Sequence, residues 1–183
     1  DMQRAVIDGD LPAAQKNAQW IVENTVADQL PVRWRPNVPR VVEAAQAVVD
    51  ATELPAAAEA TGQMARACGN CHEKMGMPLT FTEQDPPPAG RDEPDHMKRH
   101  QWGADRLWEG LVGPSDESWR SGAEALLEAP LLREGKHANG ADEQPTADRV
   151  HALGSSALSV DDPAQRAGLY GELLTTCSSC HAS

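Results

Sequence analysis

The sequence contains few aromatic residues and no long apolar run. Only five Trp, one Tyr and one Phe occur in 183 residues, whereas Ala is abundant throughout. A core of ordinary size must therefore consist of small aliphatic side chains, or be completed by a group that is not protein. Charged residues interrupt the apolar runs well before the roughly 18–20 residues that a membrane-spanning helix needs, so no membrane span is expected in this chain.

Positive charge is also scarce. Sixteen Lys and Arg against 28 Asp and Glu leave a formal net charge of −12. A field of this sign repels phosphate backbones and anionic membrane surfaces, so nucleic acid is not expected as a partner. The apolar fraction of 40% argues against a chain that is disordered throughout. The first residues do not read as a cationic and then apolar export signal.

The four cysteines stand in two copies of one motif. The copies read Cys68-Gly69-Asn70-Cys71-His72 and Cys177-Ser178-Ser179-Cys180-His181. C-x-x-C-H is the attachment signature of c-type haem, in which the two thiols add to porphyrin vinyl groups and the His becomes an axial iron ligand. A zinc ribbon typically places its two C-x-x-C pairs roughly 15–20 residues apart and needs no His after them. We therefore expect two covalent haems c, with zinc binding or thiol redox chemistry as the alternatives.

The two motifs end two copies of a longer unit. With the motifs aligned at an offset of 109, seven of the 33 positions from Arg40 to His72 are identical, and only three of these belong to the motif. The matched positions outside the motif are Arg40-Val41 with Arg149-Val150, Ala58 with Ala167, and Gly62 with Gly171. A turn that can open a helix also recurs, at residues 9–12 and 113–116. This self-similarity indicates an internal duplication.

Apolar residues recur at spacings of three and four, which predicts an all-α fold. The first copy has apolar stripes in residues 11–22, 41–49 and 54–68, and the second copy predicts helices at 92–112, 115–128, 146–158 and from 161 onward. On a helix, the two Cys and the His of each motif fall at i, i+3 and i+4 and project from one face. Residues 85–94 include three consecutive Pro and cannot be helical throughout. We expect a first haem-binding bundle in 1–78, a Pro-rich linker in 79–94, a second bundle in 95–183, and a polar surface loop at 130–145.

These features resemble the class II c-type cytochromes, the cytochrome c prime family. The run from Asp50 to Cys68 is similar to the last helix of that family, Met97-Lys98-Arg99-His100 resembles an M-x-x-H on its first helix, and Leu30-Pro31 with Trp34 resembles a loop near the haem. The resemblance implies two tandem four-helix bundles, each with one haem on its last helix. Relative to the family, the opening helix of the first copy looks truncated and the last helix ends early, so we expect incomplete ends.

Beyond the motifs, several residues are candidates for the haem sites. His100 and then Met97, with His96 beside them, are the candidate distal ligands of the second haem, although Met97 could instead be core packing and His100 a surface group. No equivalent residue is visible for the first haem. Arg40 and Arg149 are candidates for ion pairs with haem propionates, and the alternative is that both are simply exposed. Trp34 is a candidate for contact with the first haem, and the alternative is that it belongs to the core. His151 aligns with Val42, so a shared ligand role is not expected for it.

The metal ligands expected overall are His72, His181, His100 and Met97, and the covalent attachment points are Cys68, Cys71, Cys177 and Cys180. These sites predict a dihaem cytochrome that transfers electrons in the bacterial periplasm or another extracytoplasmic space. It is not expected to be an enzyme, because no acid–base constellation stands out. Redox proteins with a basic docking surface are the expected partners. Binding of nitric oxide or carbon monoxide, or a place as a subunit of a larger respiratory or photosynthetic complex, are the alternatives.

Overall fold

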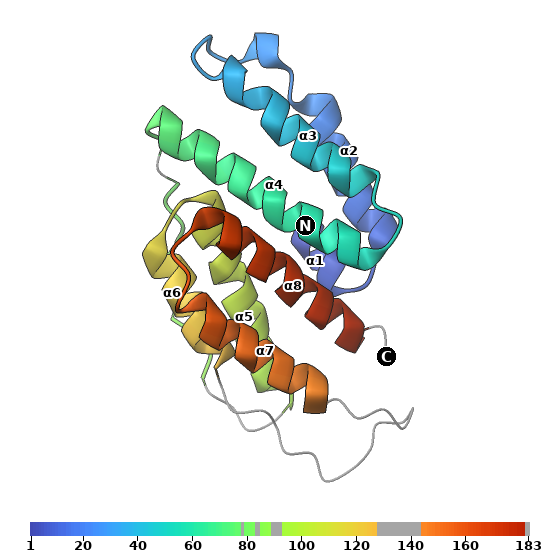
Figure 1. Ribbon diagram of the computed structural model, residues 1–183, viewed down its shortest axis with the longest axis vertical. Helices are drawn as coiled ribbons and strands as arrows, with labels where there is room; N and C mark the ends of the chain where they lie inside the picture. Colours follow the sequence, from blue (N-terminus) through green and yellow to red (C-terminus); the bar gives the residue numbers. More distant parts are fainter. Residues whose placement is uncertain (78, 83–84, 89–92, 128–143, 182–183) are drawn as a thin grey trace.

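The computed structural model describes residues 1–77, 79–82, 85–88, 93–127 and 144–181, and all the regular secondary structure in these segments is helical (Figure 1). No strand occurs in them, which confirms the prediction of an all-α fold. The helices are α1 (Met2–Ile7), α2 (Leu11–Asn24), α3 (Val38–Val49), α4 (Leu54–Met75), α5 (Glu93–Val112), α6 (Asp116–Leu126), α7 (Gln144–Ala157) and α8 (Pro163–His181), with short 3-10 turns η1 (Ala27–Gln29) and η2 (Arg35–Asn37) between α2 and α3.

The repeated turn signals open helices as the sequence predicted. The Asp10 carboxylate accepts a hydrogen bond from the backbone N–H of Ala13 at the start of α2, and the Ser115 hydroxyl accepts one from Ser118 at the start of α6. Each bond satisfies a backbone donor that the first helical turn leaves open. The helix α4 ends at Gly76, whose φ of +62° is the left-handed conformation that glycine adopts without strain.

Helix positions in the second copy also agree with the sequence to within a few residues. The ranges predicted at 92–112, 115–128, 146–158 and 161 onward correspond to α5, α6, α7 and α8. The described part of the Pro-rich segment, 79–82 and 85–88, is not helical. The polar loop predicted at 130–145 lies outside the described residues up to 143. None of the helices in the described part of the chain is both long enough and apolar enough to span a membrane.

The two copies meet at the crossing of α4 and α8, which lie side by side and antiparallel at the centre of the molecule (Figure 1). A Cβ atom on Gly62 would stand 2.3 Å from the backbone oxygen of Ala167, and one on Gly171 would stand 2.8 Å from the Cα of Glu59. Both glycines are therefore required for this approach. Because the sequence alignment pairs Gly62 with Gly171, equivalent positions of the two copies meet each other, as they do around an approximate twofold axis.

The opening helix of each copy packs against the last helix of the other copy. Helix α1 contacts α8 as well as α2, and helix α5 contacts α4 as well as α6. Buried residues from both copies form one continuous hydrophobic cluster. The copies therefore share a core across α1, α4, α5 and α8. The division into bundles at 1–78 and 95–183 stays a prediction.

Small side chains dominate the core, in agreement with the shortage of aromatic residues. The Ala residues that are less than one-tenth exposed are Ala5, Ala14, Ala18, Ala45, Ala51, Ala57, Ala58, Ala60, Ala65, Ala104, Ala123, Ala125, Ala157 and Ala167. Alanine side chains are small and let helix axes approach closely, in keeping with the close packing of α4 against α8. The large side chains are concentrated at a few positions, of which Tyr170 and Trp119 are fully buried.

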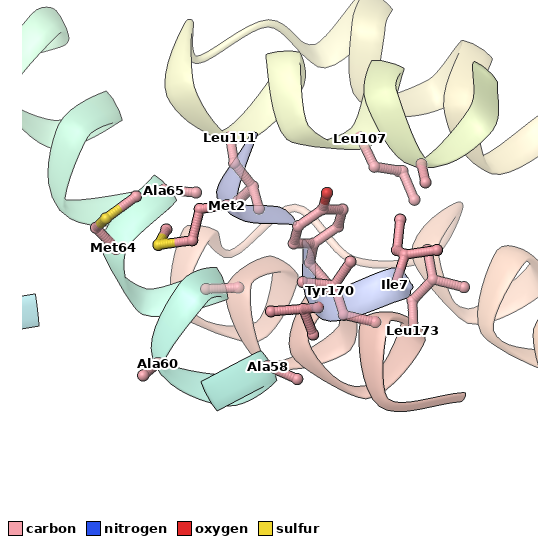
Figure 2. Packing of buried hydrophobic residues seen from close by; sticks show 14 of the residues in the cluster. Met2, Ile7, Ala58, Ala60, Met64, Ala65, Leu107, Leu111, Tyr170 and Leu173 are labelled. Atoms are coloured by element: carbon pink, nitrogen blue, oxygen red, sulfur yellow. The ribbon is translucent and has the colours of Figure 1, made fainter. Parts of the chain in front are cut away.

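Tyr170 joins the two copies at the centre of the molecule. Figure 2 shows its ring among Met2, Leu107 and Leu111, which come from α1 and α5. The hydroxyl donates a hydrogen bond of 2.5 Å to the side-chain oxygen of Gln3, whose amide nitrogen donates one of 2.8 Å to Asp105. Burial raises the pKa of Tyr170 well above its ordinary value, so the phenol is protonated and acts as the donor. This chain of bonds connects α8, α1 and α5.

Candidate functional site

The first C-x-x-C-H motif occupies the last two turns of α4, against the end of α5. A Cβ atom on Gly69 would stand 2.1 Å from the backbone oxygen of Leu111, so the backbone of α5 passes directly over the motif. The Nδ1 atom of His72 lies 2.8 Å from the backbone oxygen of Val112. A carbonyl oxygen only accepts hydrogen bonds, so this contact requires the proton on Nδ1 and leaves the lone pair on Nε2. Metal-ligating histidines characteristically donate their second nitrogen in this way.

A cavity of about 460 Å³ lies beside this motif, between α3 and α4. Its volume falls within the roughly 300–1,000 Å³ typical of small-molecule and cofactor sites. Cys71 lines it from α4 and Arg40 from α3, so the structure brings together two of the residues that the sequence singled out. The cationic side chains of Arg66 and Lys74 also line it. The cavity therefore combines a thiol of the motif with side chains that can pair with carboxylates.

Trp34 lies close to this region in sequence but does not line the cavity. It is half-buried directly before η2, whose last residue, Asn37, is a cavity residue. Its indole Nε1 is buried without a hydrogen-bond partner among the described residues. An unpartnered buried donor is uncommon in folded proteins. Contact between Trp34 and a first haem stays a prediction.

The second motif occupies the last turns of α8, where it faces the end of α1. Cys177 packs against the shared core, and the Nδ1 atom of His181 lies 3.7 Å from a carboxylate oxygen of Asp8. This distance is too long for a hydrogen bond but places an acceptor beside the ring. Asp8 comes directly after the last residue of α1, and Val112 is the last residue of α5, so the two residues occupy similar places in their copies. Each motif histidine thus meets the end of the opening helix of the other copy.

The first thiol of each motif is partly buried. Burial, followed by the neighbouring Cys71, raises the pKa of the Cys68 thiol from 9.0 to about 11. Burial, followed by Cys180, raises the pKa of Cys177 from 9.0 to about 12. Such thiols carry almost no thiolate at neutral pH and react slowly. The four described cysteines form no disulfide.

Arg149, the repeat equivalent of Arg40, has a different environment. Its guanidinium forms an ion pair with the Glu172 carboxylate on α8, and both side chains are about half exposed. Glu172 aligns with Gln63 in the first copy, which lines the cavity beside Cys71. A role for Arg149 toward a haem propionate stays a prediction.

Three imidazoles converge in the second copy. His96 and His100 stand one turn apart on α5, and His151 comes from α7. One ring nitrogen from each of the three residues lies within 4.8 Å of the corresponding nitrogens of the other two. We refer to His96, His100 and His151 as the histidine cluster. The rings of His96 and His100 are 4.1 Å apart between centroids, and the His100 and His151 rings are 5.8 Å apart.

Two of the three histidines in the cluster are buried, and His151 is partly buried. His96 is 5% exposed and His100 is 9% exposed. Burial, then the neighbouring His96 and His151, lowers the pKa of His100 from 6.5 to about 3, so its imidazole is neutral at pH 7. Among the described residues, Nδ1 of His96 and Nε2 of His100 have no hydrogen-bond partner. An imidazole nitrogen without a hydrogen-bond partner is a potential metal ligand.

The sequence identified only part of this cluster. It singled out His100 and His96, and the structure brings them together; Met97, by contrast, is 37% exposed. It missed His151, because the repeat alignment pairs that residue with Val42. Only the packing of α7 in the second copy places its ring beside those of α5, and no local sequence pattern reports that packing.

The comparisons with known proteins identify no relative. The chain matches no protein-family model, no curated protein and no solved structure.

Proposed function

We propose that this protein is a dihaem c-type cytochrome that carries electrons in an extracytoplasmic chain. The observation that supports this best is the contact of His72, because a C-x-x-C-H histidine that donates Nδ1–H to a backbone carbonyl presents Nε2 for iron. When bound, haem c supplies one-electron redox chemistry, and the protein supplies attachment, orientation and electrostatics.

The residues around the motifs suit this cofactor. Cys68 and Cys71 would hold the first group and Cys177 and Cys180 the second. Val112 orients His72, and Asp8 stands beside His181 as the corresponding acceptor. The cavity beside Cys71 also offers Arg40 as a partner for a haem carboxylate. For the second haem, the candidate distal ligands are His100, His96 and Met97, and burial favours the imidazoles over Met97.

The positions of the motifs favour two separate redox centres. Each motif histidine lies ten residues beyond the glycine that marks the α4–α8 crossing. At about 1.5 Å per residue, each lies roughly 15 Å from the crossing. The helices are antiparallel, so the two histidines are roughly 30 Å apart along the pair. Such a chain can exchange electrons with partners at both ends.

Electron-transfer kinetics test this proposal. The haem-loaded protein is mixed with a basic electron-donor protein in a stopped-flow instrument at ionic strengths from 0.01 to 0.15 M. We expect both haems to be reduced at a bimolecular rate that falls as salt shortens the screening length from about 30 to about 8 Å. Low-spin signals in low-temperature paramagnetic resonance of the oxidised protein would support the same function. High-spin haems that bind carbon monoxide rapidly but accept electrons slowly would instead favour the gas-binding alternative.

A further inference from the structure

The histidine cluster offers more ligands than a haem needs. A haem iron with a proximal histidine has one further axial position and can accept one imidazole there. Here three imidazoles from two helices converge, with one nitrogen from each within 4.8 Å of the others. A set of this kind matches the coordination sphere of a small mononuclear ion more closely than a single axial position.

We propose that His96, His100 and His151 bind one divalent transition-metal ion of the zinc and copper class, and leave one coordination position open. Imidazole nitrogen is a preferred ligand of these ions. Two histidines at i and i+4 on one helix with a third ligand from another element is a recurrent metal-binding arrangement. Three protein ligands also leave a fourth tetrahedral position for water or a small anion. The proposal uses no C-x-x-C-H residue, and it assigns His96 and His100 to this ion instead of to the iron of the second haem.

The distances are compatible with such a site. A zinc–nitrogen bond of about 2.0–2.1 Å places tetrahedral ligand nitrogens about 3.3 Å apart. The three ligand atoms lie within 4.8 Å of one another, so each pair needs to close by about 1.5 Å at most. Small rotations of imidazole rings already in contact can supply this movement.

Burial provides a second, independent observation. His96 and His100 are almost fully buried, and within the described part of the chain Nδ1 of His96 and Nε2 of His100 have no hydrogen-bond partner. Buried polar atoms are normally satisfied, and an unsatisfied one calls for an explanation such as an ion.

Metal titration of the full chain tests the proposal. The protein is produced with c-type haem maturation, stripped of weakly bound metal with a chelator, and titrated with Co²⁺ and, separately, with Zn²⁺ in competition with a chromogenic chelator. The variants are His100→Gln and His151→Gln. The matched control is Lys98→Gln, which changes a side chain that is 65% exposed on the same helical turn. Haem content and circular dichroism are measured for every variant, so failure to fold or to load haem is read separately.

We expect one equivalent of Co²⁺ per chain, with the visible absorption of a tetrahedral nitrogen-ligated ion, in the parent protein and in Lys98→Gln. Each His→Gln variant should lose more than the roughly 10- to 100-fold in Zn²⁺ affinity that removal of an outer-shell partner costs. The haem spectrum should be unchanged in all variants. Metal binding that the His variants leave intact would overturn the proposal. So would conversion of one haem to high spin in His100→Gln without any metal binding, because it would assign His100 to the haem iron.

Discussion

The crossing of α4 and α8 allows a sharp prediction about a single methyl group. In Gly62→Ala, the new Cβ would lie 2.3 Å from the backbone oxygen of Ala167, about 1 Å closer than an ordinary contact. The opposing atom belongs to the backbone and cannot rotate away, so the helices must separate. Overpacking of this kind costs about 1–3 kcal/mol and should reach the upper part of that range here. The gain in helix propensity from Gly to Ala is about 1 kcal/mol, so a net loss of about 2 kcal/mol is expected.

Gly168→Ala provides the matched control on the opposing helix. A Cβ atom at this position would meet nothing within 4 Å, so only the propensity gain of up to about 1 kcal/mol applies. For a chain of this size 1 kcal/mol corresponds to roughly 2–4 °C in Tm. Thermal unfolding followed by circular dichroism should therefore place Gly62→Ala roughly 6–12 °C below Gly168→Ala. Equal Tm values for the two variants would refute the close α4–α8 crossing.

Three further predictions concern the link between the copies, the thiols and the redox centres. Tyr170→Phe removes the hydrogen bond to Gln3 and should lower the free energy of unfolding by about 1–2 kcal/mol, measured by urea denaturation; an unchanged value would mean that this bond does not stabilise the association. In the haem-free chain, the raised pKa values predict slow alkylation at pH 8, about 100-fold slower for Cys68 and about 1,000-fold slower for Cys177 than for a thiol of pKa 9.0. Both rates should rise with pH, and rapid alkylation at pH 8, followed by peptide mass spectrometry, would contradict the raised pKa values. For two haems roughly 30 Å apart, the Coulomb coupling between their charges is about 0.14–0.6 kcal/mol. Oxidation of one haem should therefore shift the potential of the other by only about 6–25 mV in a spectroelectrochemical titration, and a shift above about 100 mV would show that the haems are close.

Local signals account for the features that the sequence predicted. The spacing of apolar residues places the helices, and the capping residues Asp10 and Ser115 fix where α2 and α6 begin. The scarcity of aromatic residues translates directly into a core rich in alanine. The C-x-x-C-H strings fall on helices because no proline interrupts the chain between the first turn of each helix and the motif histidine. In the first copy, Gly76 caps the end of α4 four residues after His72.

Contacts between the copies are the part that sequence reasoning did not predict. Gly62 and Gly171 appeared as a matched pair, but nothing in the alignment stated that the two positions face each other. The same holds for His72, whose partner is a backbone oxygen of α5 rather than a side chain with a recognisable identity. His151 joins His96 and His100 only through the packing of α7. These contacts depend on how helices that are distant in sequence pack against one another, and the spacing of residues within one helix does not predict that packing.

The intact mass of the protein tests the central claim most directly. The full chain is produced in a host that attaches c-type haem, extracted with acidic acetone to remove haem that is not covalently bound, and weighed by mass spectrometry. The account predicts the mass of the polypeptide plus two haems, falling by one haem when Cys68 and Cys71 are replaced together by Ser and by one when Cys177 and Cys180 are replaced. A chain that emerges at the mass of the bare polypeptide, with four unmodified thiols, would contradict it.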